Sequence, residues 1–158
     1  DEVCLVINKR KYWLWRAVDQ DGYELDVLLQ SRRDKEAVKR FFKKLLKGLH
    51  YVPRVAVTDK LKSYGAAFRE TTPELEHRQH KGLNNRAENS HQPTRQREKQ
   101  MRRFKSPKQA QIFLSVHGKI YNLFRCGRYT LSDDKRREAF KIARQIWNDV
   151  THSQPLAA

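Results

Sequence analysis

Two residue periodicities, which follow one another along the chain, constrain its fold more than any other feature. Residues 3–7, 12–18 and 25–29 are rich in β-branched and aromatic side chains and are separated by short polar segments, as is typical of strands joined by turns. Residues 34–49 instead carry apolar side chains at helical spacing, with Ser31 or Asp34 available as a cap and Gly48 near the end. We therefore expect a three-stranded antiparallel meander followed by an amphipathic helix.

The middle of the chain predicts a second pair of strands. Pro53 introduces a short apolar run that ends in Asp59, which suits a buried strand after a crossover helix. Residues 64–68 favour a helical turn, residues 71–73 a loop and residues 76–80 another short strand.

The second half of the chain has helical composition. Residues 84–103 are polar and basic, and Pro93 interrupts them, so we expect the helix to kink or restart there. Ser106 and Pro107 are suited to open a helix that runs to about residue 124. Ser132 or Asp133 likewise caps a last helix to about residue 150.

This order of elements matches the ribonuclease H-like architecture. We expect an α/β fold with a mixed sheet, an antiparallel three-stranded meander, a crossover helix and C-terminal helices. The chain has 158 residues and neither an internal repeat nor a low-complexity linker. One domain over residues 1–150 and a loose tail over residues 151–158 are therefore expected.

The charge of the chain indicates its partner. The chain has a formal net charge of +16 and an isoelectric point near 10.2, more positive charge than surface side chains usually carry in excess. So many like charges repel one another in the folded state unless a polyanion screens them. No stretch approaches the roughly 20 apolar residues of a spanning helix, which disfavours a membrane. Cys4 and Cys126 lie far apart, so neither a disulfide framework nor a zinc ribbon is indicated. Nucleic acid in a reducing, intracellular compartment is the expected setting.

Three acids stand where metal-dependent phosphodiester chemistry would need them. Such chemistry requires carboxylates that converge from separate elements. Asp1 opens the first strand, Asp59 closes the strand after the crossover helix, and Glu88 begins a basic helix. Asp59 is the best supported of these, since α/β folds place ligands at the carboxyl ends of strands. Glu2 and Asp26 are candidates for acids that support the site without binding metal.

The segments around these acids are more specific than the acids themselves. Residues 57–67 (VTDKLKSYGAA) and 76–91 (EHRQHKGLNNRAENSH) closely resemble the DDE-type transposases of bacterial insertion sequences, family six. The opening Asp1-Glu2-Val3, residues 15–19 and Gly22 resemble the family's first catalytic strand and its hairpin. Residues 31–34 and 104–106 agree as well, so the resemblance covers almost the whole chain in order.

The resemblance implies a ribonuclease H-like integrase or transposase catalytic core. Its catalytic and metal-binding triad falls on Asp1, Asp59 and Glu88. The family's activity implies two Mg²⁺ or Mn²⁺ ions, cleavage of DNA at the element's ends, and strand transfer into target DNA without a covalent protein intermediate. It further implies a homodimer in the bacterial cytoplasm, associated with the nucleoid.

Cationic side chains are expected to hold the DNA. Positions 88, 92, 95, 99 and 102 would share one face of a helix, which suits contact with a phosphate backbone, although a solvated face is the alternative. The residues expected to bind DNA are His77, Arg78, His80, Lys81, Arg95, Lys99, Arg102 and Arg103.

Two departures from the family leave alternatives open. The segment between Asp59 and Glu88 is several residues shorter than usual, with the loss near residues 70–74. Family members carry an N-terminal helical DNA-binding region, whereas this sequence begins at Asp1 without an initiator Met, which suggests a fragment or processed form. A ribonuclease H-like nuclease and an inactive DNA-binding transposase remnant therefore remain alternatives.

Overall fold

The structure, a computed structural model, describes residues 1–80, 82–126 and 131–152. Its contacts divide the chain into two compact units, Asp1–Ser115 and Val116–Ala158. The boundary falls inside helix α5 (Pro107–Phe124), which explains why no change of composition marks it in the sequence. The last helix, α6 (Asp133–His152), enters the expected tail by two residues, and residues 153–158 lie outside the described part. The domain limits expected from the sequence remain a prediction.

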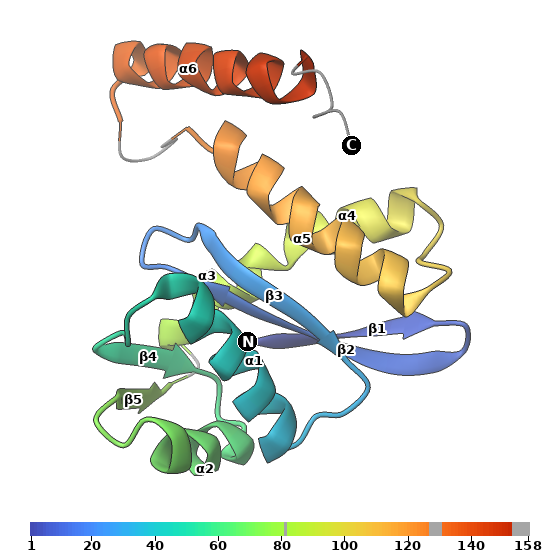
Figure 1. The fold of residues 1–158 in the computed structure, drawn as a ribbon, viewed down its shortest axis with the longest axis vertical. Helices are drawn as coiled ribbons and strands as arrows, with labels where there is room; N and C mark the ends of the chain where they lie inside the picture. Colours follow the sequence, from blue (N-terminus) through green and yellow to red (C-terminus); the bar gives the residue numbers. More distant parts are fainter. Residues whose placement is uncertain (81, 127–130, 153–158) are drawn as a thin grey trace, which may run out of the picture. The chain divides into compact units, whose positions relative to one another are not determined.

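The first three strands form the predicted antiparallel meander. Strands β1 (Glu2–Ile7), β2 (Arg10–Val18) and β3 (Glu24–Gln30) lie in the order β1-β2-β3 (Figure 1). Asn8 and Lys9 join β1 to β2 with φ angles of 50° and 63°, the backbone of a two-residue turn whose twist matches that of the strands. In the next turn, Asp19 Oδ1 accepts hydrogen bonds from the backbone N–H groups of Asp21 and Tyr23, both at 2.9 Å. Local turn chemistry therefore sets the register.

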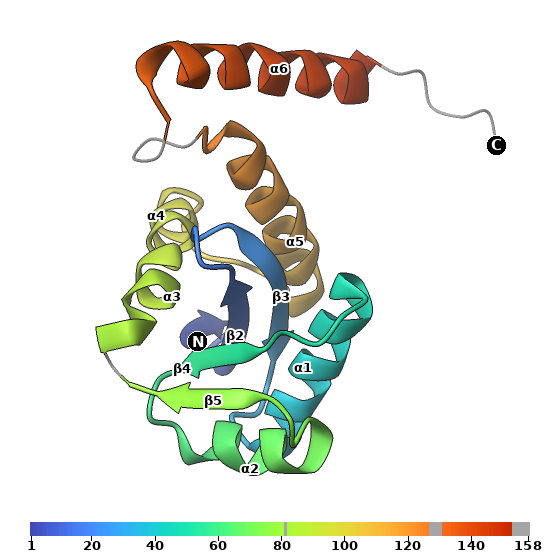
Figure 2. The same ribbon diagram turned by 90° about the vertical axis from the view of Figure 1, so that its left-hand side faces the viewer.

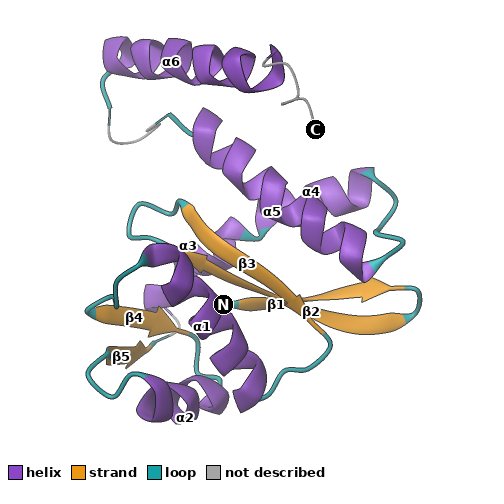
Figure 3. Ribbon diagram, in the orientation of Figure 1, coloured by secondary structure: helices purple, strands orange, loops and turns teal. Residues whose placement is uncertain are grey.

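One face of the meander is covered by two helices. Helix α1 (Lys35–Leu49) begins where Asp34 accepts a hydrogen bond from the Ala37 N–H at 2.8 Å, so Asp34 is the cap. Helix α2 (Lys62–Thr71) is longer than the single turn expected from the sequence. The apolar stripe of α1 packs with Trp15 and with α2, where the rings of Phe42 and Phe68 are 4.6 Å apart. In Figure 3, α1 lies against the meander and α2 lies next to α1.

The other face of the meander has its own core. Leu14 and Val27 pack there with Phe104 and with Ala110 and Leu114 from the first half of α5. Leu14 and Trp15 are neighbours on β2 but belong to different cores, because successive side chains of a strand point to opposite faces. The meander is therefore the middle layer of a helix–sheet–helix arrangement, which confirms the predicted α/β class (Figure 1).

A parallel pair of strands completes the first unit's β-structure. Strand β4 (Val55–Thr58) pairs in parallel with β5 (Glu76–Gln79), and α2 connects them (Figure 2). Both ladder types expected of a mixed sheet are thus present. In the described residues they form a three-stranded and a two-stranded ladder, with no hydrogen-bonded pairing between the two.

The basic helical segment restarts as predicted. A short 3₁₀ turn, η1 (Gly82–Asn84), leads into α3 (Asn85–Ser90), and α4 (Gln92–Gln100) follows after a break at His91. Pro93 lies in the first turn of α4, where its missing N–H is tolerated. The expectation that Arg102 continues one helical face is wrong, because α4 ends at Gln100 and Arg102 has a φ of 54°.

The second unit pairs the end of α5 with α6. The Phe124 ring lies 5.8 Å from that of Phe140 and 6.0 Å from that of Trp147. Ala143, one turn from Phe140, is buried. The packed face of α6 therefore carries Phe140, Ala143 and Trp147 at helical spacing. Among the described residues, no helix is both long enough and apolar enough to cross a membrane.

Candidate active site

Asp1 and Asp59 end up beside each other although they are far apart in the sequence. Asp1 immediately precedes β1, and its backbone extends the ladder by one residue, because its carbonyl accepts the Arg16 N–H at 2.9 Å. Asp59 follows β4, and its Oδ1 accepts the Leu61 N–H at 3.0 Å, which forms the turn into α2. Both carboxylates therefore sit at strand ends whose backbone is fixed.

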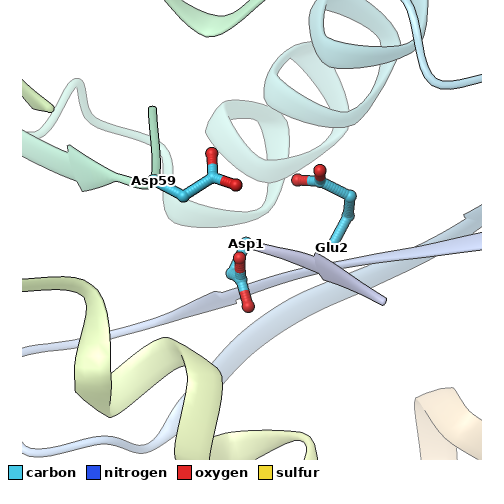
Figure 4. A group of neighbouring side chains, drawn as sticks. All are labelled: Asp1, Glu2 and Asp59. Atoms are coloured by element: carbon cyan, nitrogen blue, oxygen red, sulfur yellow. The ribbon is translucent and has the colours of Figure 1, made fainter. Parts of the chain in front are cut away.

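A third acid joins this pair. Asp1, Glu2 and Asp59 each offer a carboxylate oxygen, and these oxygens lie within 4.8 Å of one another (Figure 4). The structure thus brings two of the three predicted catalytic acids together and adds Glu2, which the sequence suggests only as a supporting acid. We call this group the acidic cluster.

Glu2 is firmly held within the acidic cluster. Its side chain has no exposed surface, and its Oε1 accepts a hydrogen bond from Arg33 Nε at 2.7 Å. Its Oε2 accepts a hydrogen bond from the Tyr64 hydroxyl at 2.7 Å. Burial, and then the negative charge of Glu2, raise the pKa of Tyr64 well above its usual value, so the hydroxyl remains a donor.

Arg16 ties strand β2 to the junction between α3 and α4. Its side chain is only 4% exposed and lies 3.1 Å from Glu24, which is 10% exposed. It also donates hydrogen bonds to the Ser90 carbonyl and to the Thr94 hydroxyl. Burial lowers the pKa of Arg16 and raises that of Glu24, and their mutual attraction opposes both shifts. The sequence gives no direct signal of this connection.

His91 contacts the acidic cluster from the same junction. Its Nε2 lies 3.2 Å from Asp1 Oδ2, and the side chain is buried. Burial, and then the positive charge of Arg16, lower the pKa of His91 to about 3. The imidazole is therefore neutral near pH 7 and contacts Asp1 as a dipole, not as a cation.

Glu88, the third predicted catalytic acid, is carried to the same region on α3. The neighbouring Ala87 and the buried Asn84 line a cavity of about 440 Å³ that Asp1 also lines. The Glu88 side chain itself is exposed. Within the described residues, the acidic cluster contains Asp1, Glu2 and Asp59 but not Glu88.

The predicted DNA-binding residues lie in two places. On and after β5, His77 is partly buried, with its Nε2 2.8 Å from the Thr58 hydroxyl and its ring edge-on to Phe68. Arg78 is exposed and donates to Glu76 at 2.7 Å, His80 is exposed, and Lys81 lies outside the described residues. The remaining four are exposed on or just after α4: Arg95, Lys99, Arg102 and Arg103. Contact with DNA remains a prediction for all eight.

The chemistry of the acidic cluster suits a hard divalent cation. Carboxylate oxygens are the ligands that Mg²⁺ and Mn²⁺ prefer. Arg33 offsets the charge of Glu2, whereas no lysine or arginine in the described chain forms a salt bridge with Asp1 or Asp59. Two adjacent carboxylates without such a partner are stabilised when a cation binds between them.

Known proteins identify the family. The protein-family model described as the DDE domain matches residues 1–126 of the sequence. The chain therefore belongs to the DDE domain family. The resemblance to insertion-sequence transposases is thereby confirmed.

Individual relatives agree with this family. The chain is 29% identical over 136 residues to the transposase for insertion sequence-like element IS431mec of Staphylococcus aureus strain Mu50, covering 83% of this chain and 59% of the relative. The transposase for IS257 in transposon Tn4003 of Staphylococcus aureus matches with the same values. An uncharacterized protein of Yersinia pseudotuberculosis is 33% identical over 70 residues, or 43% of this chain and 65% of the relative. The chain thus spans about three fifths of the length of the transposases it matches.

A solved structure also shows partial similarity. One chain of the simian T-cell lymphotropic virus intasome in complex with PP2A regulatory subunit B56 gamma aligns with this protein. The alignment covers 99% of this protein and 48% of the intasome chain. The TM-score is 0.48 and the sequence identity 13%.

Proposed function

We propose that this chain is the catalytic domain of a DNA transposase, which cuts phosphodiester bonds at the ends of an insertion sequence and transfers the freed strand into target DNA. The observation that supports this most is the convergence of Asp1 and Asp59 at two strand ends of a DDE domain. Water would attack the phosphate at the element's end and free its 3′-hydroxyl. This hydroxyl would then attack a target phosphate in line and displace the target strand's 3′-oxygen, with no covalent link to the protein.

Each acid has a distinct role in this proposal. Asp1 and Asp59 would bind Mg²⁺ or Mn²⁺, and Glu88 would supply the third carboxylate of a site for two ions. Such ions supply Lewis acidity that stabilises the charge on the phosphate during transfer. His91 would pack against the Asp1 carboxylate, and Arg16 would hold the helical junction that follows Glu88.

The charge of the protein supports DNA as the substrate. With a net charge of +16, the chain would gain affinity by releasing counterions from the phosphate backbone. Arg95 and Lys99 are exposed one turn apart on α4, which suits contacts with successive phosphates. Through its family we further propose paired element ends and target DNA as partners, a homodimer as the working form, and the nucleoid of the bacterial cytoplasm as the location.

A cleavage and joining assay tests the proposal. The purified chain is incubated with labelled DNA carrying the element's ends, a target plasmid and Mn²⁺ or Mg²⁺. We expect cleaved and target-joined products that disappear with Asp59→Asn or Glu88→Gln. Asp21→Asn, an exposed acid in the β2–β3 turn, is the matched control and should retain both products.

The other outcomes distinguish the alternatives. Nicks without joined products, or degradation of a labelled RNA–DNA hybrid in a parallel reaction, would indicate a nuclease on this fold. Salt-sensitive DNA binding without metal-dependent cleavage would indicate an inactive remnant.

A further inference from the structure

Glu2 is the member of the acidic cluster whose role the proposed function leaves open. Its side chain has no exposed surface, and both of its oxygens are occupied by protein donors. Arg33 approaches Oε1 with both Nε and Nη2, each at 2.7 Å, and so neutralises the charge. Figure 4 shows the carboxylates of Glu2 and Asp59 facing each other. A cation between the two carboxylates would have to compete with Arg33 and Tyr64 for the oxygens of Glu2. Neither of these side chains would compete with it for Asp59.

Tyr64 connects Glu2 to the chain segment that carries Asp59. Tyr64 lies on α2, five residues after Asp59, and the turn from Asp59 to Leu61 begins this helix. Glu2 follows Asp1 directly, so the hydrogen bond from Tyr64 to Glu2 links the segment that carries Asp1 to the segment that carries Asp59. This link limits how far the Asp1 and Asp59 carboxylates can move apart.

The two donors are themselves held in place. The Tyr64 ring is buried, with its centroid 5.7 Å from that of Trp15 and 6.0 Å from that of Phe68. The Cζ atom of the Arg33 guanidinium lies 4.7 Å from the centroid of the Trp13 ring. Arg33 directly precedes Asp34, the cap of α1. Glu2 is thus held from two segments at once, by Arg33 in the loop before α1 and by the buried Tyr64 on α2.

From this arrangement we infer that Glu2 is a positioning residue, which sets the separation of the Asp1 and Asp59 carboxylates through Tyr64 and Arg33 and is not itself a metal ligand. The inference rests on the proposed function, because it assumes that Asp1 and Asp59 bind the metal. Residues that orient metal ligands without touching the metal commonly change metal affinity by about 10–100-fold when they are replaced.

Direct titration with Mn²⁺ in the absence of DNA tests this role without depending on catalysis. Bound and free Mn²⁺ are separated by electron paramagnetic resonance for the wild type, Tyr64→Phe, Glu2→Gln and the double variant. Tyr64→Phe removes only the hydroxyl and keeps the ring contacts with Trp15 and Phe68. Tyr51→Phe, at an exposed tyrosine, is the matched control. Thermal unfolding of each variant reports whether it is folded at the titration temperature.

The two roles of Glu2 predict different patterns of affinity. For a positioning residue, Tyr64→Phe and Glu2→Gln each weaken Mn²⁺ binding by about 10-fold. The double variant is no weaker than the worse single variant, because the Tyr64 hydroxyl acts through Glu2. Tyr51→Phe should bind like the wild type. If Tyr64→Phe stays within about twofold of the wild type, whether or not Glu2→Gln loses affinity, the inference is overturned.

Failure of the proposed function gives a separate result. If the wild type does not bind Mn²⁺, or if Asp59→Asn binds it as the wild type does, the proposed metal site itself is wrong.

Discussion

Replacing Arg16 tests whether the β2 strand holds the helical junction beside the acidic cluster. Arg16→Met keeps the length and apolar bulk of the side chain but removes its charge and its donors. Glu24, only 10% exposed, then loses its ion pair with Arg16, and the Ser90 carbonyl and Thr94 hydroxyl lose a donor. Because removing one partner of a buried ion pair is strongly destabilising, we expect a loss of about 3–5 kcal/mol in the free energy of unfolding. That is a large share of the roughly 5–15 kcal/mol typical of a domain.

The pH dependence of this loss is set by Glu24. Burial already raises the pKa of Glu24 above 4.5, and removing Arg16 takes away the attraction that opposes this rise. An acid whose pKa is higher in the folded state than in the unfolded state stabilises the fold at low pH and loses that contribution as the pH rises through the folded-state value. The penalty of Arg16→Met should therefore be larger at pH 7 than near pH 4.5.

Urea unfolding followed by circular dichroism measures the effect at both pH values. Arg16→Met combined with Glu24→Leu should recover most of the loss, since an apolar pair leaves no buried charge. The control is Lys44→Met, which breaks the more exposed ion pair with Asp26 and should cost about 1 kcal/mol or less. If Arg16→Met costs no more than Lys44→Met, Arg16 does not hold the junction and the reasoning is refuted.

Two further predictions concern DNA binding and the second unit. Arg95→Gln and Lys99→Gln should each reduce the slope of log affinity against log salt concentration by about 0.9, as measured by fluorescence anisotropy with duplex DNA. An unchanged slope for both variants would show that α4 does not contact the DNA. Phe124→Ala deletes the ring that contacts Phe140 and Trp147, so it should expose α6 to trypsin at Arg136 and Arg137 while the helical circular dichroism stays nearly constant. Equal cleavage rates in the variant and the wild type would show that this aromatic contact does not hold α6.

Features with a local cause were predictable from the sequence. The first three strands follow from runs of β-branched and aromatic residues, and α1 follows from its apolar spacing and the Asp34 cap. The restart of the basic helix follows from Pro93, because proline is accepted in a first turn but not in a helix interior. In each case a few neighbouring residues decide the backbone.

Features that depend on distant contacts were not predictable. Glu2 and Tyr64 are 62 residues apart, and Arg16 and Thr94 are 78 apart, so no periodicity relates them. In the sequence Arg16 is an arginine between Trp15 and Ala17 in a predicted strand, which does not identify its buried partners. The end of α4 was missed because Arg102 and Arg103 adopt positive φ angles that their residue types do not favour.

The candidate site was predictable in part. Asp59 follows from its place after an apolar strand, whereas Asp1 depends on a family resemblance and on backbone pairing with Arg16 that only the fold reveals. The resemblance also names Glu88, whose exposed side chain lies outside the acidic cluster.

Anomalous diffraction from crystals soaked in Mn²⁺ tests the central claim most directly, because it locates the metal and identifies its ligands. We predict a manganese peak bound by carboxylate oxygens of both Asp1 and Asp59, with Glu2 still paired to Arg33 and Tyr64. A peak bound by Glu2 in place of either aspartate, or no peak near the acidic cluster at a saturating Mn²⁺ concentration, would contradict it.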